Sequence, residues 1–369
     1  MSLNCGIVGL PNVGKSTLFQ ALTSAPAEAA NYPFCTIDPN VGIVDVPDVR
    51  LYKITEFIKP QKIIPTTVEF VDIAGLVKGA SKGEGLGNKF LGNIRQVGAI
   101  IHVVRCFEDD NIVHVEGSID PLRDIETIEM ELAFADMETV QNRKQKNLKL
   151  TKVQDKKVAE QAKLLEPVLE ELEAHLNEGK PARSFHFNEK TLEAVNDLHL
   201  ITLKKQLYCC NVDEDNLDGN NEMVNKVKTL AEGNGSEVIV CCAKLESEIS
   251  ALDSREEKQE FLETMGLNES GLDRLIQSAY KMLKLNTYFT AGEKEVRAWT
   301  YKNGFLAPQC AGVIHTDFER GFIKAETYHC EDLFELKTEA AIKDAGKLRM
   351  EGKDYLVKDG DVLHFRFNV

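Results

Sequence analysis

Residues 9–17 read Gly9-Leu10-Pro11-Asn12-Val13-Gly14-Lys15-Ser16-Thr17, and this stretch decides the fold of the chain. It matches the pattern G-x-x-x-x-G-K-[ST]. An apolar run at residues 5–8 precedes it and predicts a buried strand, and apolar residues with helical spacing follow at 18–22. A strand, a glycine loop and a helix in this order predict a site for the phosphates of a nucleoside triphosphate.

The polar groups of this loop have separate expected roles. Backbone N–H groups and the positive end of the following helix attract phosphate oxygens. We expect the Lys15 ammonium to reach the β- and γ-phosphates and the Ser16 hydroxyl to ligate Mg²⁺. The nucleotide-binding candidates in the loop are Asn12, Val13, Gly14, Lys15, Ser16 and Thr17.

A second phosphate element is predicted where an apolar strand ends in Asp72-Ile73-Ala74-Gly75. A carboxylate at Asp72 can hold Mg²⁺ through water, and Gly75 offers a backbone N–H to the γ-phosphate. Thr36, in the proline-rich loop between the two elements, is the expected second hydroxyl ligand of the metal. The alternatives are an ordinary turn at Asp72 and an ordinary loop threonine at Thr36.

The base is expected to be selected by Asn211-Val212-Asp213-Glu214, which follows a late strand. Guanine-specific relatives carry N-K-x-D here, and the Asp accepts hydrogen bonds from guanine N1 and N2. This chain lacks the Lys, and its carboxylate is one methylene longer. The change predicts that adenine is preferred, with Asn211, Val212 and Glu214 at the base; the alternative is a GTP site with a variant motif.

Composition sets limits on the class of protein. The chain has 369 residues, a formal net charge of −15 and nine cysteines without a C-x-x-C pair. The negative charge argues against a surface that coats nucleic acid, and we expect no sequence-specific DNA binding. Free cysteines within apolar runs are typical of a reducing compartment. No signal peptide and no membrane-spanning run is recognised, so we expect a cytoplasmic protein without a membrane partner.

The order of elements predicts an α/β fold with a P-loop nucleotide-binding domain. Apolar runs at 41–46, 66–73, 99–107, 206–210 and 237–242 predict strands, and helical patterns lie between them. Strands that alternate with helices form a doubly wound parallel sheet with its site at the carboxyl ends of the strands. We assign this domain to residues 1–123 and 204–284.

An inserted helical hairpin is predicted at residues 124–203. Apolar residues step by three and four in two stretches, as in an antiparallel coiled coil. Pro167 lies in the second stretch and predicts a kink or a new helix start there. The hairpin tip, residues 143–163, carries eight basic and two acidic residues. It is interpreted as a contact for RNA or another anionic partner, or alternatively as a solvated face.

The last part, residues 285–369, is predicted to form a separate strand-rich module. Its order of elements fits a small β-grasp fold. Strands are expected at 287–290, 295–300 and 323–328, and short helices at 308–315 and 339–350. Residues 355–367 are expected to form a hairpin that turns at Asp359-Gly360.

The chain resembles the YchF family, the Obg-like ATPases within the translation-factor-related P-loop GTPases. The resemblance covers essentially the whole chain, and the residues that carry it are 9–17, 31–40, 72–88, 211–214 and 351–369. The resemblance implies ATP preferred over GTP, a helical insertion, a C-terminal TGS domain of β-grasp fold and association with ribosomes. It also implies a Mg²⁺-dependent ATPase that acts as a nucleotide switch.

The groups that activate the water are less clear from the motifs. Ras-like proteins place a glutamine directly after D-x-x-G, whereas this chain has Leu76, which cannot orient water. His114 is a candidate that swings to the γ-phosphate, or else a structural histidine. Asn12 matches a position that holds K⁺ in related enzymes, or else stabilises the turn. An Obg-type GTPase and a ribosome-binding adaptor with structural nucleotide stay open as alternative functions.

Overall fold

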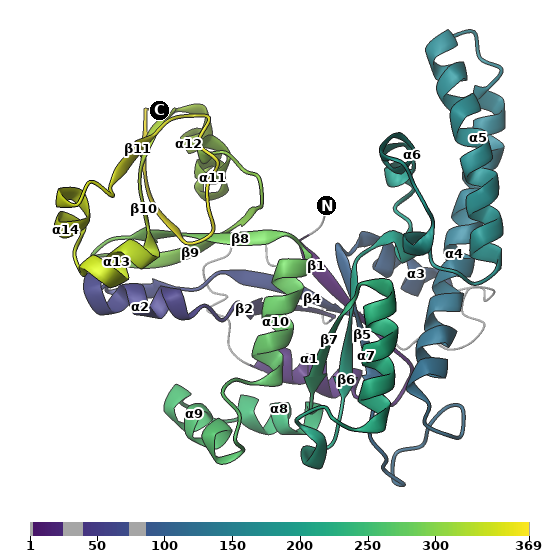
Figure 1. Cartoon of the computed structure of the whole chain (residues 1–369), viewed down its shortest axis with the longest axis horizontal. Helices are drawn as coiled ribbons and strands as arrows, with labels where there is room; N and C mark the ends of the chain where they lie inside the picture. Colours follow the sequence, from purple (N-terminus) through teal and green to yellow (C-terminus); the bar gives the residue numbers. More distant parts are fainter. Residues whose placement is uncertain (1–2, 25–39, 74–85, 369) are drawn as a thin grey trace. The chain divides into compact units, whose positions relative to one another are not determined.

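The computed structural model of the chain describes residues 3–24, 40–73 and 86–368 (Figure 1). Contacts divide the chain into two compact units, which are described separately. One unit contains Met1–Ala25, Ile37–Gly42 and Phe70–Leu275, and the other contains Pro26–Thr36, Ile43–Glu69 and Ile276–Val369. The segment at 43–69 therefore contacts the C-terminal residues, although it precedes them by more than two hundred positions. The three-part domain boundaries stay a prediction.

One sheet has the strand order β2-β4-β1-β5-β6-β7. The pairs β1–β5, β5–β6 and β6–β7 are parallel. Every residue of β5 and β6 is buried, because helices cover both faces of a sheet of this kind. The predicted mixed α/β architecture is thus confirmed. The strands are β1 (Asn4–Val8), β2 (Val41–Asp45), β4 (Thr67–Asp72), β5 (Ala99–Arg105), β6 (Gln206–Asn211) and β7 (Glu237–Cys241).

Helices follow the strands, as alternation predicts. Buried residues of α7 pack with β6 and β7 in one apolar cluster, together with Leu245 and Ile249 of α8. The helix α8 was not expected from the sequence, because it has only eight residues. The helices are α1 (Lys15–Ser24), α3 (Leu86–Gln96), α7 (Glu222–Asn234), α8 (Ala243–Ser250), α9 (Arg255–Thr264), α10 (Gly271–Met282) and the 3-10 turn η6 (Glu214–Asn216).

The insertion contains two long helices, α4 (Pro121–Leu150) and α5 (Lys156–Asn177), that run side by side in opposite directions (Figure 1). Asn147 of α4 donates to the carbonyl oxygen of Ala162 at 2.7 Å, and Lys144 pairs with Glu173. A buried leucine stripe joins the helices: Leu165, Leu169, Leu172 and Leu176. No described helix, these two included, is long and apolar enough to cross a membrane.

Of the two outcomes expected at Pro167, a new helix start is wrong, and the kink stays a prediction. The helix α5 continues through it from Lys156 to Asn177. Proline removes one backbone hydrogen bond, but buried Leu165 and Leu169 hold both sides of this position against α4. Shorter elements complete the insertion: α6 (Glu189–Val195), η3 (Ala182–Ser184), η4 (Asn196–Leu198) and η5 (Ile201–Leu203).

The second unit contains a mixed sheet with the order β11-β10-β12-β8-β9-β3. β8 and β9 form an antiparallel hairpin, and the last strand, β12, lies parallel to β8 and antiparallel to β10. The strand β3, at residues 62–64, joins the edge of this sheet beside β9. The strands are β3 (Lys62–Ile64), β8 (Leu285–Ala291), β9 (Glu295–Lys302), β10 (Phe322–His329), β11 (Arg349–Glu351) and β12 (Asp361–Phe367).

The helices of this unit are short. Leu51 and Ile54 of α2 pack with Phe289 and Val296 of the sheet and with Leu333 of α13. The burial of these residues explains why the segment at 43–69 belongs to the second unit. The helices are α2 (Val49–Ile58), α11 (Ala307–Ile314), α12 (Thr316–Arg320), α13 (Cys330–Leu336) and α14 (Glu339–Asp344).

Two predictions for this unit are wrong. The helix expected at 339–350 ends at Asp344, because Gly346 takes a positive φ of 70° and residues 349–351 pair with β10 as a strand. The hairpin expected at 355–367 is a single strand, β12. The residues before it form a turn in which the backbone N–H of Lys358 donates to Asp361 Oδ2 at 2.9 Å. A D-G pair marks the turn correctly but does not show which strands it joins.

Candidate functional site

The predicted phosphate loop connects β1 to α1. Asn12 and Gly14 have positive φ angles of 62° and 97°, which asparagine and glycine accept more readily than other residues. A Cβ at Gly14 would collide with the amide nitrogen of the Asn211 side chain. The glycine therefore allows a close approach between the loop and β6.

Lys15 lies at the start of α1 with its ammonium inside the loop. Its Nζ donates to the carbonyl oxygen of Leu10 at 2.7 Å, and the residue is buried. Burial lowers the pKa of Lys15 to about 8, because it disfavours the charged form, while Asp72 opposes this shift. Ser16 and Thr17 follow in the first turn of α1 and are exposed. The loop thus combines one enclosed cation with two accessible hydroxyl groups.

Asp72, the last residue of β4, supplies the negative charge of the site. Burial raises its pKa, and the positive charge of Lys15 opposes that effect. Its Oδ1 is buried and has no hydrogen-bond partner among the described residues. A buried carboxylate oxygen without a partner is costly, so a cation or an ordered water is the expected neighbour. The residues present therefore fit a magnesium ion.

Two further ligands were predicted, Thr36 for the metal and the N–H of Gly75 for the γ-phosphate. Thr36, Gly75 and Leu76 lie outside the described residues. Within the described part of the chain, no three His, Cys, Asp or Glu side chains group together as a metal site. Such a cluster is not needed where hydroxyl groups, phosphate oxygens and water complete the ligand set of Mg²⁺.

Asn211 connects the phosphate loop to the ends of two strands. Its side-chain nitrogen donates to the carbonyl oxygen of Val13 at 3.0 Å, and its oxygen accepts the backbone N–H of Ala243 at 2.9 Å. The sequence analysis assigned Asn211 to the base alone and missed this bridge. Since both groups of its amide are engaged, Asn211 positions the loop as well as the segment that follows β6.

The segment after Asn211 contains the base candidates. Val212 is buried and its backbone N–H donates to the carbonyl oxygen of Cys241. Glu214 is exposed, and its Oε1 lies 2.8 Å from Lys244 Nζ. No role was expected for Lys244, which lies three residues after the end of β7. A carboxylate and an ammonium group together offer an acceptor and a donor at the expected base position.

His114 is buried and both nitrogens of its ring are engaged. Nε2 lies 2.8 Å from Asp124 Oδ2, and Nδ1 accepts the backbone N–H of Glu116 at 3.1 Å. The neighbouring Val113 carbonyl accepts a hydrogen bond from Asn12 Nδ2 at 3.1 Å. The loop that carries His114 therefore contacts the phosphate loop, while the imidazole itself is bonded to the first turn of α4.

Arg105, which was not expected to have a role, donates hydrogen bonds to the loop that carries His114. It is fully buried at the end of β5. Its guanidinium donates to the carbonyl oxygens of Phe107, Asp109 and Ile112 at 3.2, 3.0 and 2.9 Å. An arginine at the end of an otherwise apolar strand was the available signal, since a buried guanidinium needs several acceptors.

The hairpin tip has two kinds of basic residue. Arg143 and Lys144 pair with Asp197 and with Glu170 and Glu173. The other six lysines are exposed and form no ion pair with the described residues: Lys146, Lys149, Lys152, Lys156, Lys157 and Lys163. Positive charge without a partner is thus concentrated in the end of α4, the connecting turn and the start of α5.

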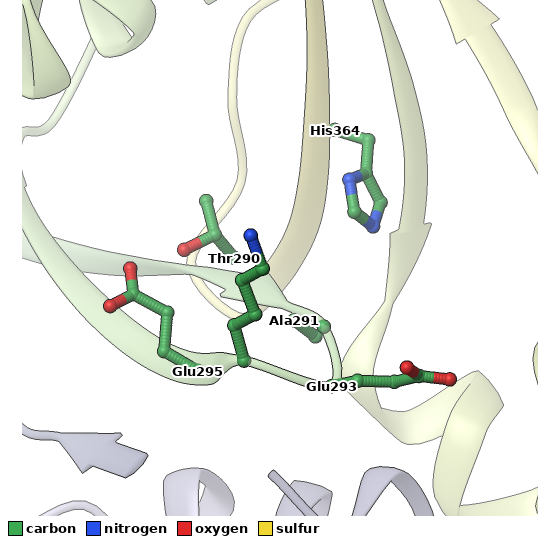
Figure 2. A pocket seen from close by; sticks show the side chains of 7 residues that line it. Thr290, Ala291, Glu293, Glu295 and His364 are labelled. Carbon is green, nitrogen blue, oxygen red and sulfur yellow. The ribbon is translucent and has the colours of Figure 1, made fainter. Parts of the chain in front are cut away.

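A shallow pocket of about 400 Å³ lies in the second unit, at the turn between β8 and β9. Residues 290–295 and His364 line it (Figure 2). None of the predicted nucleotide or metal residues is among them. The pocket therefore contributes nothing to the candidate nucleotide site.

Comparison with known proteins gives consistent results over the whole length. Residues 4–152 match a family described as "50S ribosome-binding GTPase", and residues 285–368 match the YchF-GTPase_C family, described as "Protein of unknown function (DUF933)". The chain is 60% identical to "Ribosome-binding ATPase YchF" of Bacillus subtilis (strain 168) and 55% identical to that of Pasteurella multocida (strain Pm70), with 100% of each chain covered.

A solved structure is similar over nearly its full length. It is entitled "Structure of the Schizosaccharomyces pombe YchF GTPase" and is 40% identical in sequence, with a TM-score of 0.88. The match covers 99% of this chain and 98% of that chain. The similarity in sequence and in fold therefore extends through both compact units.

Proposed function

The chain belongs to the YchF family, and we propose that it works as a ribosome-binding ATPase whose nucleotide state controls its binding to the ribosome. Relatives that match it from end to end are named as ribosome-binding ATPases. The observation that carries the proposal in this chain is the enclosed Lys15 ammonium of the phosphate loop beside the charge of Asp72, whose Oδ1 has no hydrogen-bond partner among the described residues. Both groups are in place for a triphosphate and its metal ion.

In the proposed site, Lys15 binds the β- and γ-phosphates, and backbone N–H groups of residues 12–17 surround them. Ser16, Thr36 and Asp72 would hold Mg²⁺, Asp72 through water, and the N–H of Gly75 would bind the γ-phosphate. The ion would neutralise charge on the phosphate oxygens. Lys15 gains a negative neighbour when ATP binds, and this raises its pKa and keeps it charged.

Adenine is the base that we propose for this site. The longer carboxylate of Glu214 cannot occupy the position from which an Asp would accept guanine N1–H. Adenine presents an N6–H donor and an N1 acceptor, and Glu214 and Lys244 supply the complementary groups. Val212 lies between Asn211 and Glu214 in the sequence, so we expect its backbone to be close to the base. An Obg-type GTPase is the alternative. A direct comparison of ATP binding with GTP binding distinguishes the two.

The experiment is an equilibrium titration with labelled ATP and GTP under identical Mg²⁺ conditions. We expect ATP to bind about tenfold more tightly, the difference that one well-placed hydrogen-bonding group gives. Tighter binding of GTP would contradict the assignment of the base site. Turnover measured in parallel distinguishes an enzyme from an adaptor that only holds the nucleotide.

We propose His114 as the group that acts on the attacking water, because Leu76 cannot do so. His114 is carried by a loop that contacts Asn12 of the phosphate loop. The variant His114→Ala is expected to lower kcat with little change in ATP affinity, since a group used only in the transition state does not affect substrate binding. An unchanged kcat would make His114 structural. Asn12 remains the candidate for K⁺.

The appended parts are proposed to serve the ribosome. The strand order of the second unit, with the last strand parallel to the first and between two antiparallel pairs, supports a TGS domain of β-grasp fold. The antiparallel packing of α4 and α5 supports a coiled-coil hairpin. The six exposed lysines of its tip fit the phosphate backbone of rRNA, which is bound through charge and shape.

A further inference from the structure

The loop after β5, residues 106–120, connects the phosphate loop to the start of the helical hairpin. Three of its carbonyl groups are held by buried Arg105, and the Val113 carbonyl accepts from Asn12 of the phosphate loop. At its far end the Asp120 side chain accepts the N–H groups of Leu122 and Arg123 and so begins α4. The loop therefore contacts the nucleotide site at its middle, through Val113, and joins the hairpin at its end.

His114 lies in the middle of this connection, next to Val113. Its Nδ1 accepts the N–H of Glu116, so in the neutral ring the proton lies on Nε2, which donates to Asp124. Only 4% of each of the His114 and Asp124 side chains is exposed. In this arrangement neither ring nitrogen is available to a substrate or to water. His114 must therefore leave Asp124 before it can act in hydrolysis.

Asp124 has a second partner besides His114. Its other oxygen, Oδ1, lies 3.1 Å from a guanidinium nitrogen of Arg123, and Arg123 also donates to Ser118 Oγ at 2.9 Å. The carboxylate stays paired when the imidazole departs, so release of His114 does not leave an isolated buried charge. This makes the bond between His114 and Asp124 one that can open while α4 stays capped.

We propose that Asp124 is a positioning residue for ATP hydrolysis, which holds His114 in an inactive arrangement at the first turn of the hairpin helix. The inference rests on the proposed role of His114 at the γ-phosphate. A displacement of α4 moves Asp124 relative to the loop that carries His114. Contact made by the hairpin is thereby converted into a change in the availability of His114.

The test is steady-state ATP turnover without ribosomes for Asp124→Ala, His114→Ala and the double variant. Loss of the holding bond is expected to raise kcat of Asp124→Ala about three- to tenfold, with KM within about twofold of wild type. The double variant is expected to have the low kcat of His114→Ala, because the effect of Asp124 acts only through His114. Asp124→Asn keeps the shape and an acceptor, and a smaller rise is expected.

Glu126→Gln is the matched control. It removes an exposed carboxylate charge from the same helix without touching His114 or the cap of α4, and kcat is expected to stay at the wild-type value. A wild-type or lowered kcat in Asp124→Asn, or in Asp124→Ala, would overturn the inference, as would additive effects in the double variant. A wild-type kcat in His114→Ala would instead overturn the proposed role of His114, so the two failures are distinguishable.

Discussion

The phosphate loop and the hairpin tip carry positive charge in opposite ways. Lys15 is buried, bonded to the Leu10 carbonyl and shifted in pKa by its surroundings. Lys149 and five other lysines of the tip are exposed and have no ion-pair partner among the described residues. Both regions are suited to phosphate, but one encloses a single group and the other presents many to solvent.

The difference in exposure of these charges determines which substitutions each region tolerates. An enclosed charge interacts strongly and through fixed geometry, so its loss is expected to be large and specific. Exposed charges are screened by salt and contribute in small, similar steps. The phosphate loop is therefore suited to catalysis of ATP hydrolysis, and the hairpin tip is suited to reversible binding of a large polyanion.

The largest effect is expected from Lys15→Ala. Removal of the cation that faces the β- and γ-phosphates should lower ATP turnover by more than about 100-fold, because it acts where negative charge develops. Turnover is measured with saturating ATP and Mg²⁺, and thermal unfolding checks that the fold remains. A rate close to wild type would place the active site elsewhere and would remove the contrast between the two regions.

A second enclosed charge, Glu246 of α8, tests whether burial has the expected energetic effect. Its Oε1 accepts the N–H of Gly271 at 2.7 Å, and burial raises its pKa from 4.5 to about 7. The folded state then binds more protons than the unfolded state between these pH values, so stability decreases as pH rises through that range. The contribution is roughly 3 kcal/mol.

Glu246→Gln is expected to remove most of this pH dependence. The measurement is the free energy of unfolding by denaturant at pH 5.5 and at pH 8. Glu248→Gln, an exposed position on the same helix, is the control and should follow wild type. Equal pH slopes for Glu246→Gln and wild type would show that the buried carboxylate is not the group that titrates.

A smaller effect is expected from Asn211→Ala, which removes the bridge between Val13 and Ala243 but no charge. Two buried backbone groups lose their partner, at about 1–3 kcal/mol. The KM for ATP should rise about tenfold, whereas kcat should change less, because the loop is loosened rather than its cation lost. Asn220→Ala, at an exposed position nearby, should leave both constants unchanged.

The smallest effects are expected from single lysines of the hairpin tip. Lys149→Gln should weaken ribosome binding a few-fold and reduce the slope of log affinity against log salt by about 1. Lys144→Gln should have less effect, because Glu170 and Glu173 already neutralise that side chain. Equal losses for the two variants would mean that pairing within the hairpin does not matter to the partner.

The strand and the helix on either side of the phosphate loop were predicted correctly because this part of the fold is local. Residues 9–17 are contiguous, and their order of strand, loop and helix is set by short-range geometry. The partners that Asn211 and Arg105 find could not be predicted, because they depend on how distant strands align in the sheet. His114 shows the same limit, since its bond to Asp124 requires the position of α4.

The second unit was predicted less accurately for a related reason. The segment at 43–69 reads as part of the nucleotide domain, because it lies between two of its motifs. Its apolar residues Leu51 and Ile54 have the spacing of a helix face, but spacing does not identify the surface that the face covers. In the same way, the turn at Asp359-Gly360 does not reveal that β12 pairs with β8 and β10.

The most direct test is whether ribosome binding can be lost while ATP turnover is kept. The variant Lys146→Glu, Lys149→Glu, Lys152→Glu and Lys156→Glu reverses four exposed charges of the tip and none of the phosphate loop. Co-sedimentation with ribosomes at several salt concentrations is measured beside ATP turnover without ribosomes. We expect binding to fall by at least about tenfold at low salt, with turnover unchanged. Wild-type binding, or a parallel loss of turnover, would contradict the account.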